Sequence, residues 1–274
     1  MITREPEYFP LPANFVGRLG RGIVFSCRGL GRALLLLVDT LACMRFVLAK
    51  RTRKEIVYQM FVSGIKSLGV ITVVAMFTGM ILALQTGIEL RKFNQEVNIG
   101  AAVMVSMLRE MGPFMTALIL AASVGSAYAA QMGTMVVSEE IAALEIMSIN
   151  PVRFLVLPRL VSLMVMTPLL TFYSCVMGVL GGGMVGMTQL SVPWHAYIRN
   201  ALDFAATKDL YVGLFKAFIF GVIIAIVACH QGFSTTQGAV GVGNATRRTV
   251  IVCFLTILVA GYIVTRLFYI SALD

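Results

Sequence analysis

The sequence is poor in charged residues. Asp, Glu, Lys and Arg make up only 13% of it, whereas 58% of its residues are hydrophobic and its mean hydropathy is +0.88. A typical soluble domain has about 25% charged residues. This shortage excludes an ordinary soluble domain and predicts an all-α membrane protein that crosses the bilayer several times.

Residues that commonly hold metals, disulfides or nucleotides are also scarce. The two histidines, His195 and His230, and the five cysteines have no paired spacing, so neither a metal site nor a disulfide framework is expected. No Gly-Lys pair occurs, which excludes a phosphate-binding P-loop. We therefore expect no cofactor in this chain. The cysteines are predicted to be small buried hydrophobic residues: Cys27, Cys43, Cys175, Cys229 and Cys253.

Long apolar runs are abundant. About 20 apolar residues are needed for a helix to cross the hydrocarbon core, and five segments meet or approach that length. The third is long enough to tilt or to continue past the bilayer. The predicted spans cover residues 60–84, 101–122, 155–187, 211–229 and 250–269.

Positive charge is concentrated at one end of the chain. The formal net charge is +9, and eleven of the 22 Lys and Arg residues lie within residues 1–66. Because basic flanking segments stay in the cytoplasm, we expect a cytoplasmic N-terminus and, after five spans, a C-terminus on the outer side. These bases are not on a compact folded face, so nucleic acid is not an expected partner.

Residues 1–55 are predicted to form an N-terminal region before a transmembrane domain at residues 56–274. Apolar and basic positions alternate through residues 13–50, which favours a helix lying in the cytoplasmic interface of the membrane. The alternative is a short extra span at residues 33–48, although Asp39 and Arg45 interrupt it. The first residues include acids and prolines where a signal peptide would be basic and then apolar, so no cleavage is expected.

Arg109 and Glu110 lie within the otherwise apolar second span. An isolated charge there would cost about 2.5–3.5 kcal/mol. Adjacent helical positions point about 100° apart, so the two side chains are expected to have different partners, with Lys216 of the fourth span reaching Glu110. The pattern fits a structural ion-pair network, the polar floor of a substrate cavity, or both. Gln85 adds a polar group near the outer end of the first span.

Small residues recur at four-residue spacing in the second and third spans. Such faces let another helix backbone approach closely, so we expect tight packing, either within one subunit or across a dimer. A lumen lining is the alternative. The residues are Ala122, Gly125, Ser126, Ala129, Ala130 and Gly133, followed by Gly178, Gly182 and Gly186.

A short acidic segment with apolar residues follows the second span. Ser138 is predicted to be the N-cap of a short helix with acids in its first turn, and Pro151 is predicted to close it. An apolar stripe on a loop favours docking into a groove on another protein, whereas the alternative, a solvated turn, would not need that stripe. The stripe contains Ile141, Leu144, Ile146 and Met147, beside Glu139, Glu140 and Glu145.

Residues 192–204, between the third and fourth spans, have an amphipathic pattern. We expect a helix at the outer membrane interface, because tryptophan and tyrosine are enriched at that depth. Trp194 and Tyr197 are the predicted anchors.

Two motifs carry a resemblance to a known family. Residues 108–113, Leu-Arg-Glu-Met-Gly-Pro, resemble the Leu-Arg-Glu-Leu-Gly-Pro signature of the MlaE/YrbE permeases of bacterial MCE-type lipid ABC transporters. Residues 139–145, Glu-Glu-Ile-Ala-Ala-Leu-Glu, are similar to the coupling helix of that family. The resemblance covers about residues 60–269, including residues 231–250, and residues 1–60 match only in character.

The resemblance implies a homodimeric permease of the bacterial inner membrane, without catalysis of its own, that moves phospholipid or a related lipid. A separate ATPase dimer would bind ATP and Mg and dock on the coupling helix. An MCE-domain protein would lie on the periplasmic side and often a STAS-domain protein on the other. By resemblance, the ATPase contacts would be Glu139, Glu140, Ile141, Leu144 and Glu145, and the polar residues near the lipid path would be Gln85, Arg109, Glu110 and Lys216.

Three positions depart from the family pattern. Ser123 replaces a usual Arg, Gln131 replaces a usual Glu, and Gly261 falls where some members have an Asp. These differences imply an interior with fewer charges. Two other functions stay open as alternatives: a membrane scaffold that anchors an MCE ring, and an intramembrane enzyme that uses Arg109 and Glu110 as an acid and base.

Overall fold

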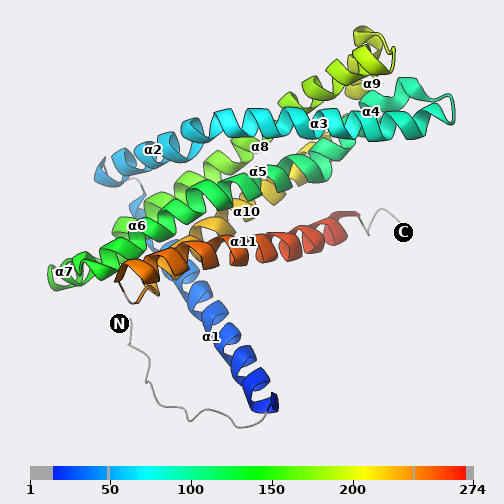
Figure 1. Ribbon diagram of the computed structural model, residues 1–274. Coiled ribbons are helices and arrows are strands. Elements are labelled where there is room, and N and C mark those ends of the chain that lie inside the picture. Colours follow the sequence, from blue (N-terminus) through cyan, green and yellow to red (C-terminus); the bar gives the residue numbers. More distant parts are fainter. Residues whose placement is uncertain (1–14, 48–49, 237, 270–274) are drawn as a thin grey trace.

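The computed structural model describes residues 15–47, 50–236 and 238–269 (Figure 1). Every regular element in these residues is a helix, which confirms the predicted fold class. In chain order the elements are α1 (Phe15–Ala42), η1 (Cys43–Phe46), α2 (Lys50–Gly64), η2 (Ile65–Ser67), α3 (Leu68–Arg91), η3 (Glu96–Asn98), α4 (Ile99–Ser106), η4 (Met107–Met111), α5 (Gly112–Leu120), η5 (Ala121–Gly125), α6 (Ser126–Val137), α7 (Glu140–Ile146), η6 (Val152–Val156), α8 (Leu157–Gln189), α9 (Trp194–Asp203), α10 (Thr207–Phe233) and α11 (Gly238–Tyr269).

Five segments of the described residues are long and apolar enough to cross a membrane, and each contains one of the five predicted spans and extends beyond it. The first three contain 40, 42 and 38 residues, and the last two contain 27 and 32. Since about 20 residues cross the hydrocarbon core, the first three spans are long enough to extend well beyond it. The chain is a multi-pass membrane protein. The spans are Thr52–Arg91, Glu96–Val137, Val152–Gln189, Thr207–Phe233 and Gly238–Tyr269.

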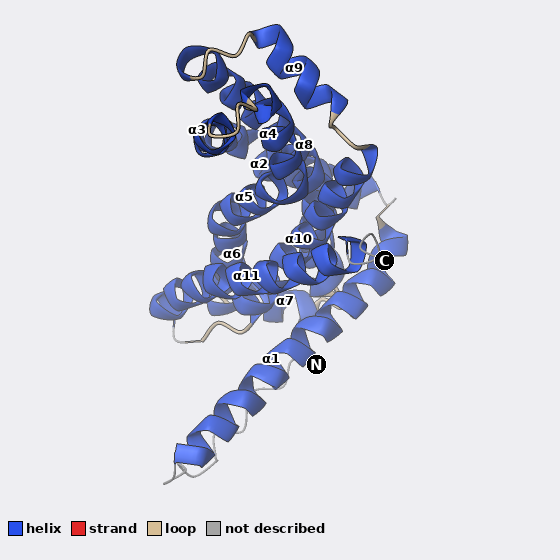
Figure 2. Ribbon diagram, turned by 90° about the vertical axis from the view of Figure 1, so that its right-hand side faces the viewer, coloured by secondary structure: helices blue, strands red, loops and turns tan. Residues whose placement is uncertain are grey.

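The spans run roughly along one axis, with α7 at one extremity and α9 at the other (Figure 1). We refer to these as the α7 end and the α9 end. Helix α3 packs along α8, and α10 contacts α5, α6, α8 and α11. Figure 2 shows α3 and α11 on opposite sides of the bundle. Helix α11 begins near the α7 end and runs toward the α9 end.

The main hydrophobic core lies where α10 packs against α5, α6 and α8. Leu120, Phe220 and Ile224 are among its fully buried residues. The predicted burial of cysteines is confirmed for three of them, whereas the side chain of Cys27 lies outside the described residues. The buried cysteines are Cys175, Cys229 and Cys253, and Cys43 is half-buried.

Glycines bring α3 and α8 into backbone contact. A Cβ atom added at Gly79 would overlap the carbonyl group of Gly178. Gly182 lies between the Gly79 carbonyl and the hydroxyl of Tyr197, and Gly186 faces the Tyr197 ring. Tight packing at Gly178, Gly182 and Gly186 is thereby confirmed within one subunit.

Helix α9 forms as predicted, but the prediction that Tyr197 is an interface anchor is wrong. Its side chain is fully buried, and its hydroxyl donates a hydrogen bond to the Val179 carbonyl at 3.0 Å. The space beside Gly182 and Gly183 accommodates the ring. Burial raises the pKa of the Tyr197 phenol above its ordinary value. Trp194 stays partly exposed and stacks on the Tyr197 ring.

Helix α1 projects away from the bundle (Figure 1). It is not among the candidate spans of the described chain, so a short extra span at residues 33–48 is not supported. Leu36 and Leu37 pack against the main core, whereas Leu34 and Leu35 are exposed. The side chains of residues 15–27 lie outside the description, and the placement of α1 in the membrane interface remains a prediction.

Candidate functional site

The second span is irregular where it carries its charges. Arg109 and Glu110 lie in η4, a π-helical turn, and Pro113 follows in the first turn of α5. In an α-helix the N–H group of residue 113 would donate to the Arg109 carbonyl, but proline has no N–H group. Lys216 Nζ of α10 donates to this carbonyl at 2.8 Å. A lysine from another helix therefore replaces a missing backbone donor at a π-helical turn, a feature often found at functional sites.

A glycine allows α10 to come this close. Gly213 lies four residues after Asp209 and three before Lys216, so all three are on one face of α10. It contacts the backbone of η4, and an added Cβ atom would overlap the Leu108 carbonyl. Asp209 and Lys216 therefore reach the charges of η4 from either side of this contact.

Glu110 forms the first ion pair. Its Oε1 atom lies 2.7 Å from Lys216 Nζ and accepts a hydrogen bond of 2.8 Å from Thr265 Oγ1 of α11. The predicted contact with Lys216 is confirmed. The Lys216 side chain is 1% exposed, whereas the Glu110 side chain is 45% exposed. Water can solvate the charge of Glu110 but not that of Lys216, so the charge of Lys216 must be compensated by the Glu110 carboxylate.

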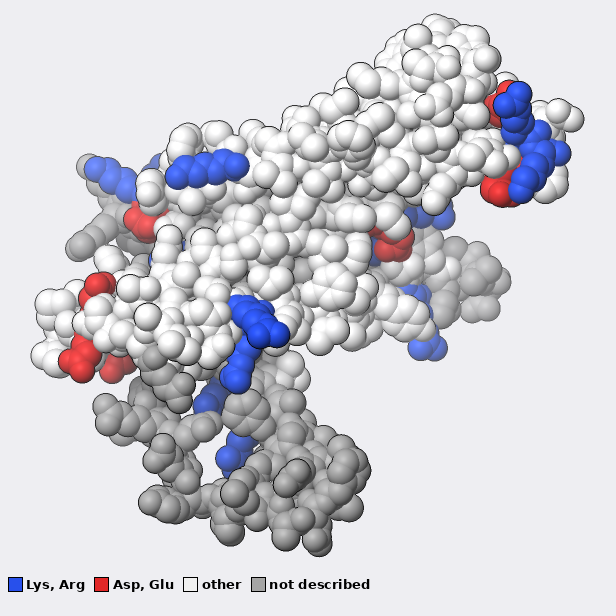
Figure 3. All heavy atoms as spheres, in the orientation of Figure 1, with Lys and Arg blue, Asp and Glu red and all other residues white. Residues whose placement is uncertain are grey.

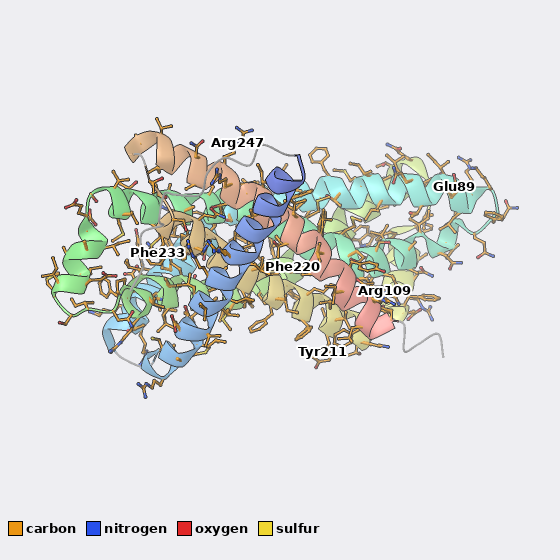
Figure 4. The ribbon with its side chains drawn as sticks, turned by 90° about the horizontal axis from the view of Figure 1, so that it is seen from below. Glu89, Arg109, Tyr211, Phe220, Phe233 and Arg247 are labelled. Carbon is orange, nitrogen blue, oxygen red and sulfur yellow. The ribbon has the colours of Figure 1, made fainter. Side chains whose placement is uncertain are left out.

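Arg109 forms the second ion pair, beside the end of α11 (Figure 4). Its Nε atom lies 2.9 Å from Asp209 Oδ2, although the alignment is not that of a hydrogen bond. Tyr269 donates its hydroxyl to Asp209 Oδ1 at 2.6 Å, and Arg109 Cζ lies 4.8 Å from the centre of the Tyr269 ring. Separate partners for Arg109 and Glu110 are thus confirmed.

Asp209, Thr265 and Tyr269 also belong to this cluster and were not predicted from the sequence. A signal existed for Asp209, because it precedes Lys216 by seven residues, or about two turns of one helix face. Thr265 and Tyr269 are likewise one turn apart on α11. Nothing in the sequence indicated which helix would meet them.

A cavity of about 310 Å³ opens beside Glu110. This is at the lower end of the range of about 300–1,000 Å³ for small-molecule sites. The cavity has a polar end at Glu110, Lys216 and Thr265 and can hold an apolar chain whose polar group lies at that end. Its other lining residues are Phe114, Phe220, Ile257, Leu258, Gly261 and Tyr262.

Gly261 keeps part of this cavity open. A Cβ atom there would lie 3.4 Å from the Phe220 ring, so a longer side chain would enter the space between α10 and α11. Gln85, in contrast, is exposed on α3 and does not line the cavity. The structure therefore brings together three of the four predicted intramembrane polar residues, Arg109, Glu110 and Lys216.

The two small-residue faces of the second span have different surroundings. Gly125, Ala129 and Gly133 are buried, and Gly133 contacts Thr235, which confirms close packing within the subunit. Ala122 and Ser123 are exposed, and Ser126 and Ala130 are half-buried. This second face is uncovered in one protomer.

Helix α7 lies between α6 and η6, and Figure 3 shows acidic side chains at this end of the molecule. Ile141 is buried against Met132 and Leu155, so it fixes α7 to the protomer. Ile146 is 85% exposed and Met147 is 60% exposed. Leu144 is half-buried, and the exposed acids are Glu139, Glu140 and Glu145.

The predicted limits of α7 need correction. Ser138 is not its N-cap, because its hydroxyl lies 2.9 Å from the Thr134 carbonyl and 3.1 Å from Glu140 Oε1 and can donate its single proton to either acceptor. The N-cap is Glu139, whose φ of 59° reverses the chain after α6. Pro151 does not close α7, which ends at Ile146, but precedes η6.

A buried arginine joins the two helices that flank α7. Arg159 of α8 donates to the Leu155 carbonyl at 2.9 Å and to Gln131 Oε1 of α6 at 3.2 Å. Its Cζ atom lies 5.4 Å from the centre of the Tyr128 ring. Within the described residues no carboxylate pairs with Arg159. Gln131 therefore gives this guanidinium a neutral partner.

The two ion pairs leave both charges of η4 engaged by other side chains. Glu110 accepts hydrogen bonds from Lys216 and Thr265. A carboxylate held by two donors from other helices suits the binding and orientation of a ligand. The site is a polar cluster at one end of an apolar cavity.

Comparison with known proteins identifies the family. The family model described as Permease MlaE matches residues 56–267. A probable ABC transporter permease protein of Rickettsia conorii is 36% identical over 214 residues, covering 78% of this chain and 83% of the relative. The intermembrane phospholipid transport system permease protein MlaE of Haemophilus influenzae is 32% identical over 262 residues, covering 93% and 98%. This chain therefore belongs to the MlaE permease family.

Proposed function

We propose that the chain is the transmembrane subunit of an ABC transporter that moves phospholipid or a related lipid between the bacterial inner membrane and an MCE-domain carrier. Family membership and the phospholipid transport role named for the Haemophilus relative support the transport role. The cavity supports the substrate class, because it is apolar along most of its length and polar at one end.

The strongest support for the proposal comes from the exposed surface of α7. Ile146 and Met147 face outward beside Glu140 and Glu145, while Ile141 anchors the helix to the protomer. An apolar and acidic helix that is fixed on one side and exposed on the other fits a groove on a partner. A separate ATPase, which binds ATP and Mg, docks here, and the α7 end is cytoplasmic.

A second copy of the chain covers the exposed small-residue face of the second span. The hydroxyls of Ser123 and Ser126 both donate to carbonyl groups of their own helix, at Ile119 and Ala122. Few polar groups on this face therefore need a hydrogen-bond partner from outside, and its small residues let another helix approach closely. The dimer encloses the lipid cavity, whose volume in one protomer is small for a diacyl lipid, and the MCE-domain partner lies at the α9 end.

Charge reversal on α7 tests this proposal. Glu139→Lys combined with Glu140→Lys should abolish co-purification of the ATPase, because both carboxylates are exposed on the docking surface. The protein should melt at an unchanged temperature, since neither residue is buried. Glu89→Lys, on an exposed residue at the far end of α3, is the matched control. ATPase binding that survives the double reversal would show that α7 is not the docking helix.

A further inference from the structure

Two cations lie against the last turn of α11, beyond the polar end of the cavity. Arg109 Cζ is 4.8 Å and Lys208 Nζ is 5.7 Å from the centre of the Tyr269 ring. Lys208 is exposed in the first turn of α10. Among the described residues it has no carboxylate partner and no hydrogen bond. Its ammonium group is therefore available to a ligand.

Arg109 also keeps part of its guanidinium available. Its Nε atom faces Asp209, and its side chain is 42% exposed. Within the described part of the chain, no hydrogen bond is formed by its two terminal nitrogens. These nitrogens form the planar fork that binds phosphate with two parallel hydrogen bonds.

Asp209 does not cancel the charge of this group. Its side chain is 3% exposed, and its two oxygens face Arg109 Nε and the Tyr269 hydroxyl. It compensates one of the two cations and is shielded from a ligand on the open side. Arg109, Lys208 and Asp209 together carry one net positive charge, whereas Glu110 and Lys216 cancel each other.

We propose that Arg109 and Lys208 bind the phosphate of the transported lipid, which extends the proposed function and rests on it. A phosphodiester carries a single negative charge, which matches the net charge of the group. Tyr269 is one helical turn beyond Thr265, at the polar end of the cavity. The headgroup then lies toward the α9 end, and an acyl chain runs along Phe220 and Ile257 toward the α7 end.

The test compares two lipids that differ only in the phosphate-containing headgroup. The full-length chain in detergent micelles is offered equal amounts of phosphatidylethanolamine and of diacylglycerol with the same acyl chains, and retained lipid is measured by mass spectrometry. The wild-type protein should favour the phospholipid. Lys208→Gln should lower that preference by about tenfold, because one of two cations at the phosphate is lost. Lys208→Arg should restore it.

Controls separate the possible failures. Lys92→Gln removes an exposed lysine at the tip of α3, where it pairs with Glu89, and should leave the preference unchanged. An unchanged preference in Lys208→Gln would overturn this inference while leaving the transport role intact. A wild-type protein that retains neither lipid would instead contradict the proposed function.

One further arm distinguishes a lipid headgroup from free phosphate. Glycerol 3-phosphate, which carries a phosphate but no acyl chain, is added at the same concentration as the phospholipid. The inference predicts that it does not displace the retained phospholipid, because the acyl chains contribute most of the contact with the cavity. Efficient displacement would show a site for soluble phosphates and would overturn the inference.

Discussion

The α7 surface and the polar cluster beside the end of α11 differ in how their charges are compensated. At α7 the carboxylates of Glu139, Glu140 and Glu145 are exposed and surround apolar residues that are exposed as well. Near the end of α11, Arg109 and Glu110 are paired with Asp209 and Lys216, which are almost fully buried. The α7 surface leaves charged and apolar side chains exposed together, as the proposed docking of a partner protein requires, whereas the charges of the polar cluster are paired with one another beside a cavity.

This difference indicates where mutations should change the stability of the fold and where they should change the association with a partner. Exposed charges contribute little to stability, about 0–1 kcal/mol for an ion pair. A buried charge that loses its partner is expensive. Substitutions in the cluster should therefore change the melting temperature, while substitutions on the exposed face of α7 should change partner binding alone.

The largest change in stability is expected when the buried Lys216 loses its charged partner Glu110. Glu110→Gln leaves the buried ammonium group without compensation, so we expect a loss of about 3–5 kcal/mol in the free energy of unfolding. Lys216→Met leaves a carboxylate that is half exposed, together with an unpaired Arg109 carbonyl, and should cost only about 1–2 kcal/mol. Thermal unfolding of both variants in the same detergent gives the comparison. Equal losses would mean that the two charges are equally solvated.

A medium effect is expected at the contact between α10 and η4. Gly213→Ala places a methyl group against the Leu108 carbonyl, so α10 must move away and both ion pairs must lengthen, at a cost of about 1–3 kcal/mol. Gly243→Ala is the matched control, because nothing lies within 4 Å of its added Cβ atom. Alanine there should stabilise α11 by about 0.5–1 kcal/mol. Melting temperatures that shift in the same direction would refute the close approach.

The smallest effect is expected beside α7. Gln131→Glu gives the buried Arg159 a charged partner at the position of the present 3.2 Å hydrogen bond. We expect a gain of about 1 kcal/mol, since hydrogen bonds between charged groups are stronger than those with a neutral partner. Gln189→Glu, on an exposed residue at the end of α8, controls for the added charge. A gain in both variants would show that Arg159 is not involved.

Hydropathy and charge were sufficient to predict the five spans and the contact between Glu110 and Lys216, because a charge in an apolar helix needs a partner on another one. They could not predict η4, because hydropathy and charge do not locate a π-helical turn within an apolar span. They also gave no sign that Lys216 would donate to the Arg109 carbonyl as well as to Glu110. Asp209 was missed because it lies in the first turn of α10, just before the apolar run.

Other differences arise from packing that a single helix does not show. The amphipathic pattern of α9 suggested that Tyr197 faces the membrane interface, but the glycines of α8 leave a space that its ring enters. In the same way, Ile141 belongs to the stripe of α7 in sequence and to the core in the structure. Periodicity identified these faces, and only the tertiary contacts determine which of them is covered.

The most direct test of the account measures retained lipid and bound ATPase in the same preparation of two variants. Gly261→Leu fills the cavity beside Phe220 without altering an ion pair, and the double reversal Glu139→Lys with Glu140→Lys changes only the α7 surface. We expect the first variant to lose lipid and keep the ATPase, and the second to keep lipid and lose the ATPase. If Gly261→Leu retained lipid at the wild-type level, or the double reversal retained the ATPase, the division of roles between the cavity and the α7 surface would be contradicted.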